Sequence, residues 1–199
     1  MLLLTLALVV LTAGLRSRDA QAPPVFGAVA EFALTNQFGQ AISREDLSGR
    51  VWVADIIFTR CPGPCLRMTR QMKELQEALP PASRTRLVSL TTDPDFDTPA
   101  VLKQYGERFS ADTNRWTFLT GTKREIGDLA AGGLKLSAVE KSAAERDSAD
   151  DLFIHSTVFV VVDRRGRLRG VFETGGEGVE WASQKEKILA TVRQLERAP

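Results

Sequence analysis

Two cysteines in one short segment are the residues of this sequence with the most clearly defined chemistry. Cys61 and Cys65 are separated by Pro62, Gly63 and Pro64, and they lie between a strongly apolar run and a predicted helix. Proline suits the first position of a helix, so Pro64 would place Cys65 in the first helical turn. The helix dipole and the unbonded backbone N–H groups of that turn favour a thiolate. We therefore hypothesise that the pKa of the Cys65 thiol is depressed.

The spacing of the two cysteines argues against a purely structural disulfide. Such a bridge would close a loop of about five residues, for which the chain-entropy relation gives only ~2 kcal/mol of stabilisation. A redox pair of the thioredoxin type usually has two intervening residues, whereas this loop has three. The extra residue loosens the disulfide geometry and leaves space for a third ligand. Redox or metal chemistry is therefore the better interpretation of the pair.

His155 is the candidate third ligand because it is the only histidine in the chain. It directly precedes a β-branched run that begins at Thr157, and spacing alone does not place it near the cysteines. An isolated histidine is more often a packed or solvated side chain than a ligand. Two thiolates and an imidazole, however, form a soft three-ligand set that suits copper, especially Cu(I), and is too small for a structural zinc site. Copper is therefore the metal that these three residues favour.

The composition limits the remaining classes of protein. A chain of 199 residues with 43% hydrophobic residues is long enough for one domain with an ordinary core. Its 26 basic and 25 acidic residues give a net charge of +1, so no overall field favours nucleic acid and no nucleic-acid partner is expected. The sequence also lacks a Gly-x-Ser-x-Gly segment, a phosphate-binding loop and a dinucleotide fingerprint. Hydrolases and nucleotide-dependent enzymes are therefore not supported.

The first residues of the chain are typical of a targeting segment. Residues 1–15 carry no charge, and their apolar stretch is short for a membrane span, which needs about 20 residues. No basic residue precedes the apolar run, so a cleaved signal and an uncleaved anchor both remain open. We expect residues 1–22 to be a signal peptide or N-terminal membrane anchor and residues 23–199 to be one exported domain, in a compartment where thiols meet oxidising conditions.

The rest of the chain alternates strand and helix signals. This order predicts an α/β protein with a mixed central sheet. A charged segment at 137–151 is expected to be an exposed insertion, and Gly132-Gly133 is expected to end the helix before it. The expected elements are a hairpin over 32–42 with its turn at 36–40, strands at 51–58, 86–91, 116–119 and 157–162, a strand at 168–172 paired with the one before it, and helices at 66–79, 98–109, 123–131 and 181–195.

Several motifs in a fixed order make the chain resemble the Sco/SenC family. They are the cysteine loop, the segment Thr91-Thr-Asp-Pro-Asp-Phe-Asp-Thr-Pro99 with Val101 to Tyr105, the turn Leu119 to Thr122, the triplet His155-Ser156-Thr157, and Asp163-x-x-Gly166. The resemblance covers roughly residues 32–195. It implies a thioredoxin-like fold whose mixed central sheet is flanked by helices, with an N-terminal hairpin extension and a charged insertion before the strand that bears the histidine.

The resemblance also implies a function and a site. The protein would be a copper-binding metallochaperone that helps to build the dinuclear copper centre of cytochrome c oxidase. Its domain would face the periplasm, anchored at the inner membrane or secreted, or the mitochondrial intermembrane space in a eukaryote. The implied ligands of Cu(I) or Cu(II) are Cys61, Cys65 and His155. The implied partners are the copper-site subunit of the oxidase or other copper chaperones, together with the membrane through the N-terminal segment.

The chain departs from the family pattern at three positions near these ligands. Gly63 stands where family members commonly have Asp, Leu66 where they have Pro, and Ile154 where an Asp usually precedes the histidine. The ligands are intact, but carboxylates that would adjust the charge near the site are missing. Copper affinity and the choice of partner are therefore the properties most open to change.

Four further residues near these motifs have two interpretations each. Asp93 and Asp97 match the family's acidic motif and are candidates for supporting the site or contacting a partner, but ordinary turn and helix-capping chemistry explains them equally well. Met68 and Met72 look like thioether ligands, although their spacing of four residues on a helix favours core packing. The tryptophans are expected in the core or at its rim.

Three functions remain open at this point. The first is a copper-binding assembly factor, the second a thiol–disulfide oxidoreductase or peroxiredoxin-like enzyme that uses Cys61 and Cys65, and the third a redox or copper sensor that acts by binding a partner. Only the first uses His155, and it is the reading that we favour. Catalysis is confined to thiol exchange by the two cysteines if it occurs.

Overall fold

A computed structural model describes residues 22–61, 63–145 and 153–198 of the chain. Residues 1–21 of the expected targeting segment lie outside this part. The elements are β1 (Gly27–Ala28), β2 (Ala33–Asn36), β3 (Ala41–Ser43), α2 (Arg44–Leu47), β4 (Trp52–Ile57), α3 (Pro64–Ala78), β5 (Arg86–Thr91), α4 (Pro99–Arg108), β6 (Trp116–Thr120), α5 (Lys123–Gly127), the π-helix η1 (Asp128–Leu134), β7 (Ala138–Glu140), the 3-10 helix η2 (Ala143–Glu145), β8 (Phe153–His155), β9 (Val158–Val162), β10 (Arg167–Glu173) and α6 (Trp181–Arg197).

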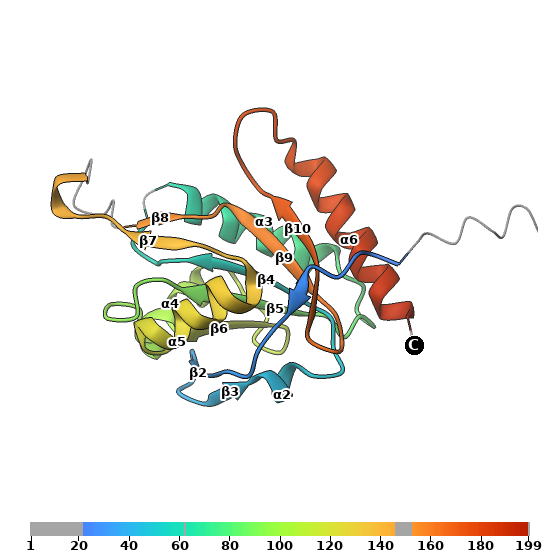
Figure 1. Cartoon of the computed structure of the whole chain (residues 1–199), viewed down its shortest axis with the longest axis horizontal. Helices are drawn as coiled ribbons and strands as arrows, with labels where there is room; N and C mark the ends of the chain where they lie inside the picture. Colours follow the sequence, from blue (N-terminus) through green and yellow to red (C-terminus); the bar gives the residue numbers. More distant parts are fainter. Residues whose placement is uncertain (1–21, 62, 146–152, 199) are drawn as a thin grey trace, which may run out of the picture.

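A mixed sheet of eight strands organises the molecule (Figure 1). Its strand order is β1-β10-β9-β4-β5-β6-β2-β3. The strands β4, β5 and β6 are parallel neighbours, and the remaining pairings are antiparallel. β4 lies in the middle of the sheet, and all six of its residues are buried. The cysteine loop that follows β4 is therefore attached to a well-packed strand. The prediction of a mixed α/β sheet is confirmed.

Alternation along β4 divides the core into two clusters. Side chains of successive strand residues point to opposite faces. Val53 and Ile57 belong to the cluster that includes buried residues of α3, α4 and α6, whereas Trp52, Ala54 and Ile56 belong to the cluster that includes residues of α5 and η1. Helices therefore cover both faces of the sheet, and the carboxyl end of β4 is enclosed from both sides (Figure 1).

Most predicted elements lie where the sequence places them. The hairpin of β2 and β3, the four main strands and the helices α3, α4 and α6 agree with the expected ranges within a few residues. Trp52 and Trp116 are fully buried and Trp181 packs at the rim of the core, as expected. Met68 and Met72 are also fully buried in the core, which confirms their packing role.

The helix that begins at Lys123 differs from the prediction at its end. The chain does not stop at Gly132-Gly133 but continues as η1 to Leu134, and Lys135 takes the left-handed conformation with a φ of 58°. Gly133 is buried, and a Cβ there would lie at an ordinary contact distance, 3.4 Å, from side-chain atoms of both Leu129 and Val29. The predicted end of this helix at Gly132-Gly133 is therefore too early, because the residue that ends it in the left-handed conformation is Lys135.

The expected insertion contains structure that the sequence signals did not predict. Strand β7 pairs antiparallel with β8 in a separate two-stranded sheet, which we call the β7–β8 arm. His155 is therefore the last residue of a short strand rather than part of a loop before β9. Each strand has only three residues, and such short runs carry little periodicity. Residues 146–152 of the insertion lie outside the described part.

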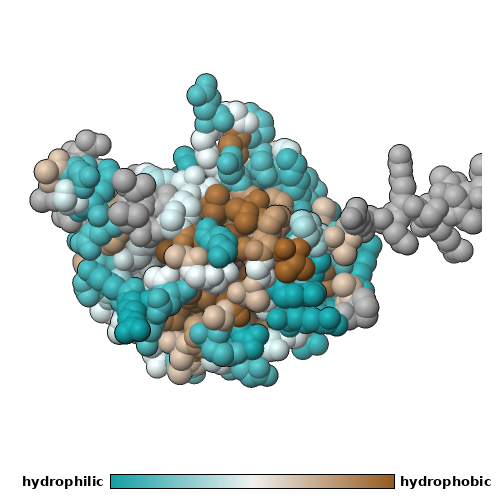
Figure 2. Space-filling view, viewed as in Figure 1, coloured by the Kyte–Doolittle hydropathy of each residue, from teal (hydrophilic) through white to brown (hydrophobic). Residues whose placement is uncertain are grey.

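Apolar side chains also reach the surface. Figure 2 shows them gathered in the middle of one face, around the region of β1, β9 and β10. The exposed large apolar residues include Val25 and Phe26 before β1 and Val171 in β10. Among the residues described, no helix is both long enough and apolar enough to cross a bilayer.

Candidate metal centre

The cysteine loop connects the carboxyl end of β4 to the first turn of α3. Phe58 follows β4 directly, and its backbone carbonyl accepts a hydrogen bond from the N–H of Cys61 over 3.3 Å. The backbone N–H of the same Phe58 donates to Sγ of Cys65 over 3.4 Å. Both sulfurs are thiols rather than halves of a disulfide, and both side chains are buried. Phe58 therefore fixes both ends of the loop at once.

Burial raises the pKa of the Cys65 thiol far above its ordinary value. Loss of solvation is the largest cause, and the neighbouring Cys61 and the charge of Asp55 act in the same direction. The N–H of Phe58 lowers the pKa, but not enough to compensate. The hypothesis of a depressed pKa at Cys65 is therefore wrong. Position in the first turn of α3 does favour the thiolate, but complete exclusion from water outweighs it.

A buried hydroxyl pair supports α3 behind the cysteine. Thr69 donates from its hydroxyl to the carbonyl of Cys65 over 2.9 Å, and its Oγ1 lies 2.7 Å from the hydroxyl of Tyr105 in α4. Both side chains are almost completely buried. The first turn of α3 is thus tied to α4, so the position of Cys65 depends on two helices.

Asp97 holds the loop from the side of β5. Its carboxylate accepts hydrogen bonds from the backbone N–H of Thr59 over 3.1 Å, from the hydroxyl of Thr59 and from the hydroxyl of Thr91 over 2.5 Å. Asp97 is fully buried, and burial raises its pKa even though these donors oppose the shift. The N-cap of α4 is Thr98, whose side chain accepts from the N–H of Val101. Asp97 is therefore not a capping residue but a brace for the loop.

Asp93 holds the residue next to Cys61. Its carboxylate pairs with the guanidinium of Arg60 over 2.5 Å, and only 8% of its side chain is exposed. The same guanidinium lies 4.2 Å from the ring centre of Phe96. Asp93 and Asp97 therefore bind Arg60 and Thr59, the two residues that lead into the cysteine loop.

The strand that carries His155 is fixed by its backbone. His155 lies opposite Ala138 in the β7–β8 arm. The next residue, Ser156, donates its N–H to the carbonyl of Ser137 over 2.8 Å, and its hydroxyl accepts from the N–H of Ser137 over 3.2 Å. The side chain of His155 lies outside the described part, so its placement relative to the sulfurs stays a prediction.

The arm contacts the cysteine loop through an aromatic pair. Phe153, two residues before His155, packs edge to face on Phe58 with ring centroids 5.2 Å apart. Phe58 is the residue whose N–H binds the sulfur of Cys65. The fold thus brings the backbone of the histidine strand to the cysteine loop, although the two segments are far apart in the sequence.

Thr157, two residues after His155, is connected to α3 through Thr174. The hydroxyl and the N–H of Thr174 both donate to the carbonyl of Thr157, over 2.7 and 2.8 Å. The carbonyl of Thr174 accepts from the side-chain amide of Gln71 in α3 over 2.8 Å. His155 therefore lies between two fixed points, Phe153 and Thr157, and both are connected to elements that carry the cysteines.

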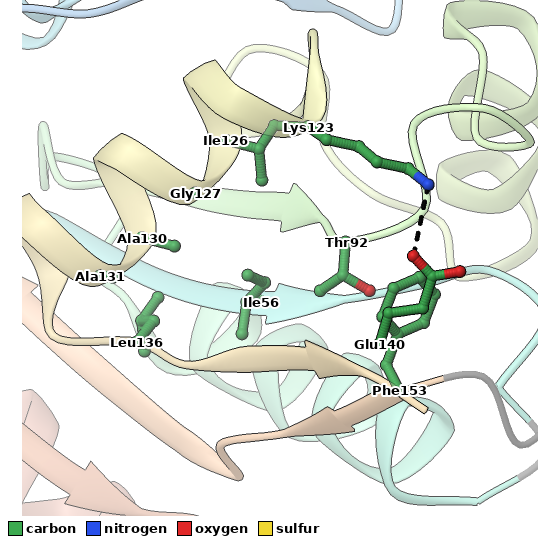
Figure 3. A pocket seen from close by; sticks show the side chains of 10 residues that line it. All are labelled: Ile56, Thr92, Lys123, Ile126, Gly127, Ala130, Ala131, Leu136, Glu140 and Phe153. Carbon is green, nitrogen blue, oxygen red and sulfur yellow. Dashed lines mark hydrogen bonds and ion pairs between the residues drawn. The ribbon is translucent and has the colours of Figure 1, made fainter. Parts of the chain in front are cut away.

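A pocket of about 180 Å³ lies beneath the arm (Figure 3). Its walls are mostly apolar and include Ile56 and Phe153, and Lys123 reaches across its mouth to Glu140 of β7 over 3.4 Å. The hydroxyl of Thr92 in this pocket has no hydrogen-bond partner among the described residues. The arm lies over a cavity here, which makes the packed contact between Phe153 and Phe58 an important anchor.

Among the side chains that the structure describes, no three His, Cys, Asp or Glu residues gather closely enough to hold a metal. Asp93 and Asp97 are engaged with Arg60, Thr59 and Thr91 and do not join the sulfurs in such a group. The thiols of Cys61 and Cys65 are soft donors that lie next to each other in the described part. This pair fits a soft metal that accepts few ligands and does not fit a hard cation, which needs oxygen donors.

The departure from the family pattern at Gly63 is sterically neutral. Gly63 is exposed, and a Cβ at this position would meet no atom within 4 Å. An Asp would therefore fit, so its absence changes the charge of the loop without being required by packing.

Phe58 and Thr69 are supporting residues of the site that the sequence analysis missed. Only their places directly after a buried strand and one helical turn after Cys65 could have indicated them.

Comparison with known proteins identifies the family. The sequence profile of SCO1/SenC matches residues 20–190. The SCO1 protein homolog of Bacillus subtilis is 33% identical over 147 residues, which are 73% of this chain and 73% of that protein. This chain therefore belongs to the SCO1/SenC family.

Solved structures agree with this assignment. The structure of BsSco, described as a member of the Sco family of cytochrome c oxidase assembly proteins with a disulfide switch, superposes with a TM-score of 0.73 at 30% identity, covering 90% of this chain and 100% of that one. Copper-bound yeast Sco1 gives a TM-score of 0.68 at 22% identity over 84% of this chain and 89% of the other. The prediction of a thioredoxin-like fold of the Sco type is confirmed.

Proposed function

We propose that this protein binds one copper ion as cargo through Cys61, Cys65 and His155. The observation that carries the proposal is the double contact of Phe58, which binds the sulfur of Cys65 and packs on the strand of His155. Two thiolates and one imidazole form a soft three-ligand set that suits copper. Membership of a family with copper-bound structures supports the same metal.

The residues around the cysteine loop hold it in place for copper binding. Asp97 and Asp93 hold Thr59 and Arg60, and the pair of Thr69 and Tyr105 holds the turn that carries Cys65. A loop that is held before the metal arrives loses less conformational freedom on binding. Binding needs both sulfurs as thiolates, so the thiol protons leave as copper enters. Release would proceed by exchange of these ligands for those of an acceptor protein.

The acceptor that we infer is the dinuclear copper site of cytochrome c oxidase, reached directly or through another copper chaperone. The family link of BsSco to oxidase assembly supports this inference. The apolar residues 1–15 support export, with the domain from residue 23 outside the cytoplasm, anchored or secreted.

The experiment is a copper titration of the reduced full-length protein. The wild type should bind one copper per chain, and Cys61→Ser or Cys65→Ser should nearly abolish binding, because a neutral hydroxyl cannot replace a soft thiolate. His155→Ala should lose Cu(II) affinity while the thermal stability of the metal-free protein changes little. Undiminished binding in either serine variant would refute the proposal.

A second function, thiol–disulfide exchange, is favoured by the adjacency of the two thiols. Cys61 lies close enough to Cys65 to form a hydrogen bond that raises the pKa of Cys65. The disulfide switch described for BsSco supports exchange as an accompanying step. The high pKa of Cys65 limits its rate of attack as a thiolate. We expect weak insulin reduction beside a thioredoxin measured in parallel, and turnover equal to that control would make exchange the main function.

A further inference from the structure

Three arginines open the three parallel strands of the sheet. Arg50 lies two residues before β4, Arg86 is the first residue of β5, and Arg115 directly precedes β6. The strands are hydrogen-bonded there, since the N–H of Arg86 donates to the carbonyl of Val51 and the N–H of Leu87 donates to the carbonyl of Arg115. The parallel register therefore brings three arginines to the amino-terminal end of β4, β5 and β6. Arg84, two residues before β5, is a fourth arginine in this region.

These arginines line a cavity of about 240 Å³. Ser83, Thr85, Asn114 and Asp112 complete its lining. None of the four arginines forms an ion pair with any carboxylate of the described residues. Arg50, Arg86 and Arg115 are half-buried, so water solvates them only in part.

Two carboxylates near the cavity offset only part of this charge. Asp112 is the one acidic side chain among the lining residues. Glu196 of α6 lies nearby, but its carboxylate accepts from the hydroxyls of Ser83 and Thr85 and from the backbone N–H of Arg84. Four guanidiniums therefore lie near two carboxylates, which leaves an excess of positive charge at the cavity in a chain whose net charge is only +1.

The pKa of Arg86 is lowered, as expected for an arginine in an excess of positive charge. Burial lowers its pKa, and the charges of Arg50, Arg115 and Arg84 lower it further, while Asp112 only partly opposes them. Like charges held together cost folding free energy unless an anion joins them. Arg115 donates to the carbonyl of Pro80 over 3.4 Å, but this neutral acceptor does not balance its charge. A bound anion would therefore stabilise this group of guanidiniums.

We propose that the cavity framed by Arg50, Arg84, Arg86 and Arg115 binds a phosphate-type oxyanion. Guanidinium groups are planar forks that bind two phosphate oxygens at once, and several of them can surround one tetrahedral anion. The side-chain amide of Asn114 offers a further donor at the same rim. The anion is an inorganic phosphate or the headgroup of an anionic phospholipid, which share this chemistry.

The anion site lies at the opposite end of the sheet from the cysteine loop. The arginines are at the amino ends of β4 and β5, whereas the loop and Asp93 follow their carboxyl ends. Strands of six residues separate the two sites by about 20 Å. Binding at one site therefore leaves the ligands of the other untouched.

The first test measures the binding of inorganic phosphate to the full-length protein by calorimetry, against chloride at equal ionic strength. The wild type should bind one phosphate saturably and gain thermal stability in its presence. Arg86→Gln/Arg115→Gln should bind about tenfold more weakly, or worse, because charge-assisted hydrogen bonds are lost. Arg70→Gln/Arg193→Gln, which removes two exposed arginines outside the cavity, should behave as the wild type.

A second variant and a second probe separate the remaining outcomes. Arg84→Gln alters an exposed side chain, so it should weaken phosphate binding without affecting folding. Vesicles of phosphatidylcholine with phosphatidylglycerol are compared with phosphatidylcholine alone. Extra binding to the anionic vesicles that the double variant loses identifies a headgroup, and phosphate binding without it identifies a free anion. Phosphate binding that is absent, or unchanged in both cavity variants, would overturn the proposal.

Discussion

Phe58 and Phe153 pack edge to face with their ring centroids 5.2 Å apart, and this contact joins the cysteine loop to the strand of the only histidine. The N–H of Phe58 also binds the sulfur of Cys65. One residue therefore links the three proposed ligands through its backbone and its ring. The contact depends on pairing of β7 with β8, because that pairing holds Phe153 in an extended strand.

The aromatic contact can be tested by shortening Phe153. Phe153→Ala should weaken Cu(II) binding about tenfold, since residues that orient a metal ligand typically have effects of this size. It should cost roughly 1–2 kcal/mol of stability, because the ring is only half-buried. Phe172→Ala, a half-buried aromatic of β10, is the matched control and should lose stability while retaining copper affinity. Equal copper affinity in the two variants would show that the contact has no part in the site.

The brace formed by Asp97 can be tested against a neighbour that lacks its contacts. Asp97→Ala removes the acceptor of Thr59 and Thr91, so we expect a stability loss of about 2 kcal/mol and faster hydrogen exchange at the N–H of Thr59. Asp95→Ala is the control, because Asp95 is exposed and its ion pair with Lys123 is at the surface. An unchanged exchange rate at Thr59 in Asp97→Ala would contradict the role of Asp97 as a brace.

The sequence predicted the parts of the fold that long periodic signals encode. The buried run of β4, the amphipathic α3 and the Thr98-Pro99 start of α4 each carry enough residues or specific caps to be recognised. The two sulfurs are side by side because the loop between them is short. Their place at the end of a central strand follows from the alternation of strands and helices.

Other features depend on contacts that no local pattern contains. The pairing of Phe58 with Phe153 joins segments that are almost a hundred residues apart, across an insertion with weak signals. The pKa of Cys65 was predicted with the wrong sign, since helix position is readable from sequence and complete burial is not. The end of η1 is predicted too early because the pair Gly132-Gly133 is a local stop signal, whereas the helical turns continue to Leu134.

The buried carboxylate of Asp163, in the turn between β9 and β10, makes the stability of the fold depend on pH in the acid range. Burial opposes ionisation of Asp163, but hydrogen bonds from Arg167, Arg169 and the N–H of Arg165 lower its pKa below the usual value. A lowered folded-state pKa gives stability that is complete above the unfolded value, about 4, and is lost as the pH falls through the folded value.

Asp163→Asn should therefore destabilise the protein by about 3 kcal/mol at neutral pH, because Arg169 would stay buried without the carboxylate that balances its charge. Urea unfolding at several pH values should show this difference shrinking below about pH 4. Asp128→Asn, at an exposed position of η1, should change little at any pH. A difference that stays constant down to acid pH would contradict the assignment. Copper stoichiometry should remain that of the wild type.

Redox state and copper loading should exclude one another. Copper needs two thiolates, so a disulfide between Cys61 and Cys65 should prevent Cu(I) loading until a reductant is added. The measurement is copper per chain after gel filtration of oxidised and reduced protein. Equal loading of both forms would place the metal elsewhere.

The ligand set itself is tested most directly by X-ray absorption spectroscopy of the copper-loaded full-length protein. We predict two sulfur ligands and the multiple-scattering pattern of one imidazole in the wild type. The imidazole pattern should disappear in His155→Ala while both sulfurs remain, and one sulfur should be lost in Cys61→Ser or Cys65→Ser if any copper still binds. A wild-type spectrum with fewer than two sulfurs, or an imidazole signal that survives in His155→Ala, would contradict a copper site built from Cys61, Cys65 and His155.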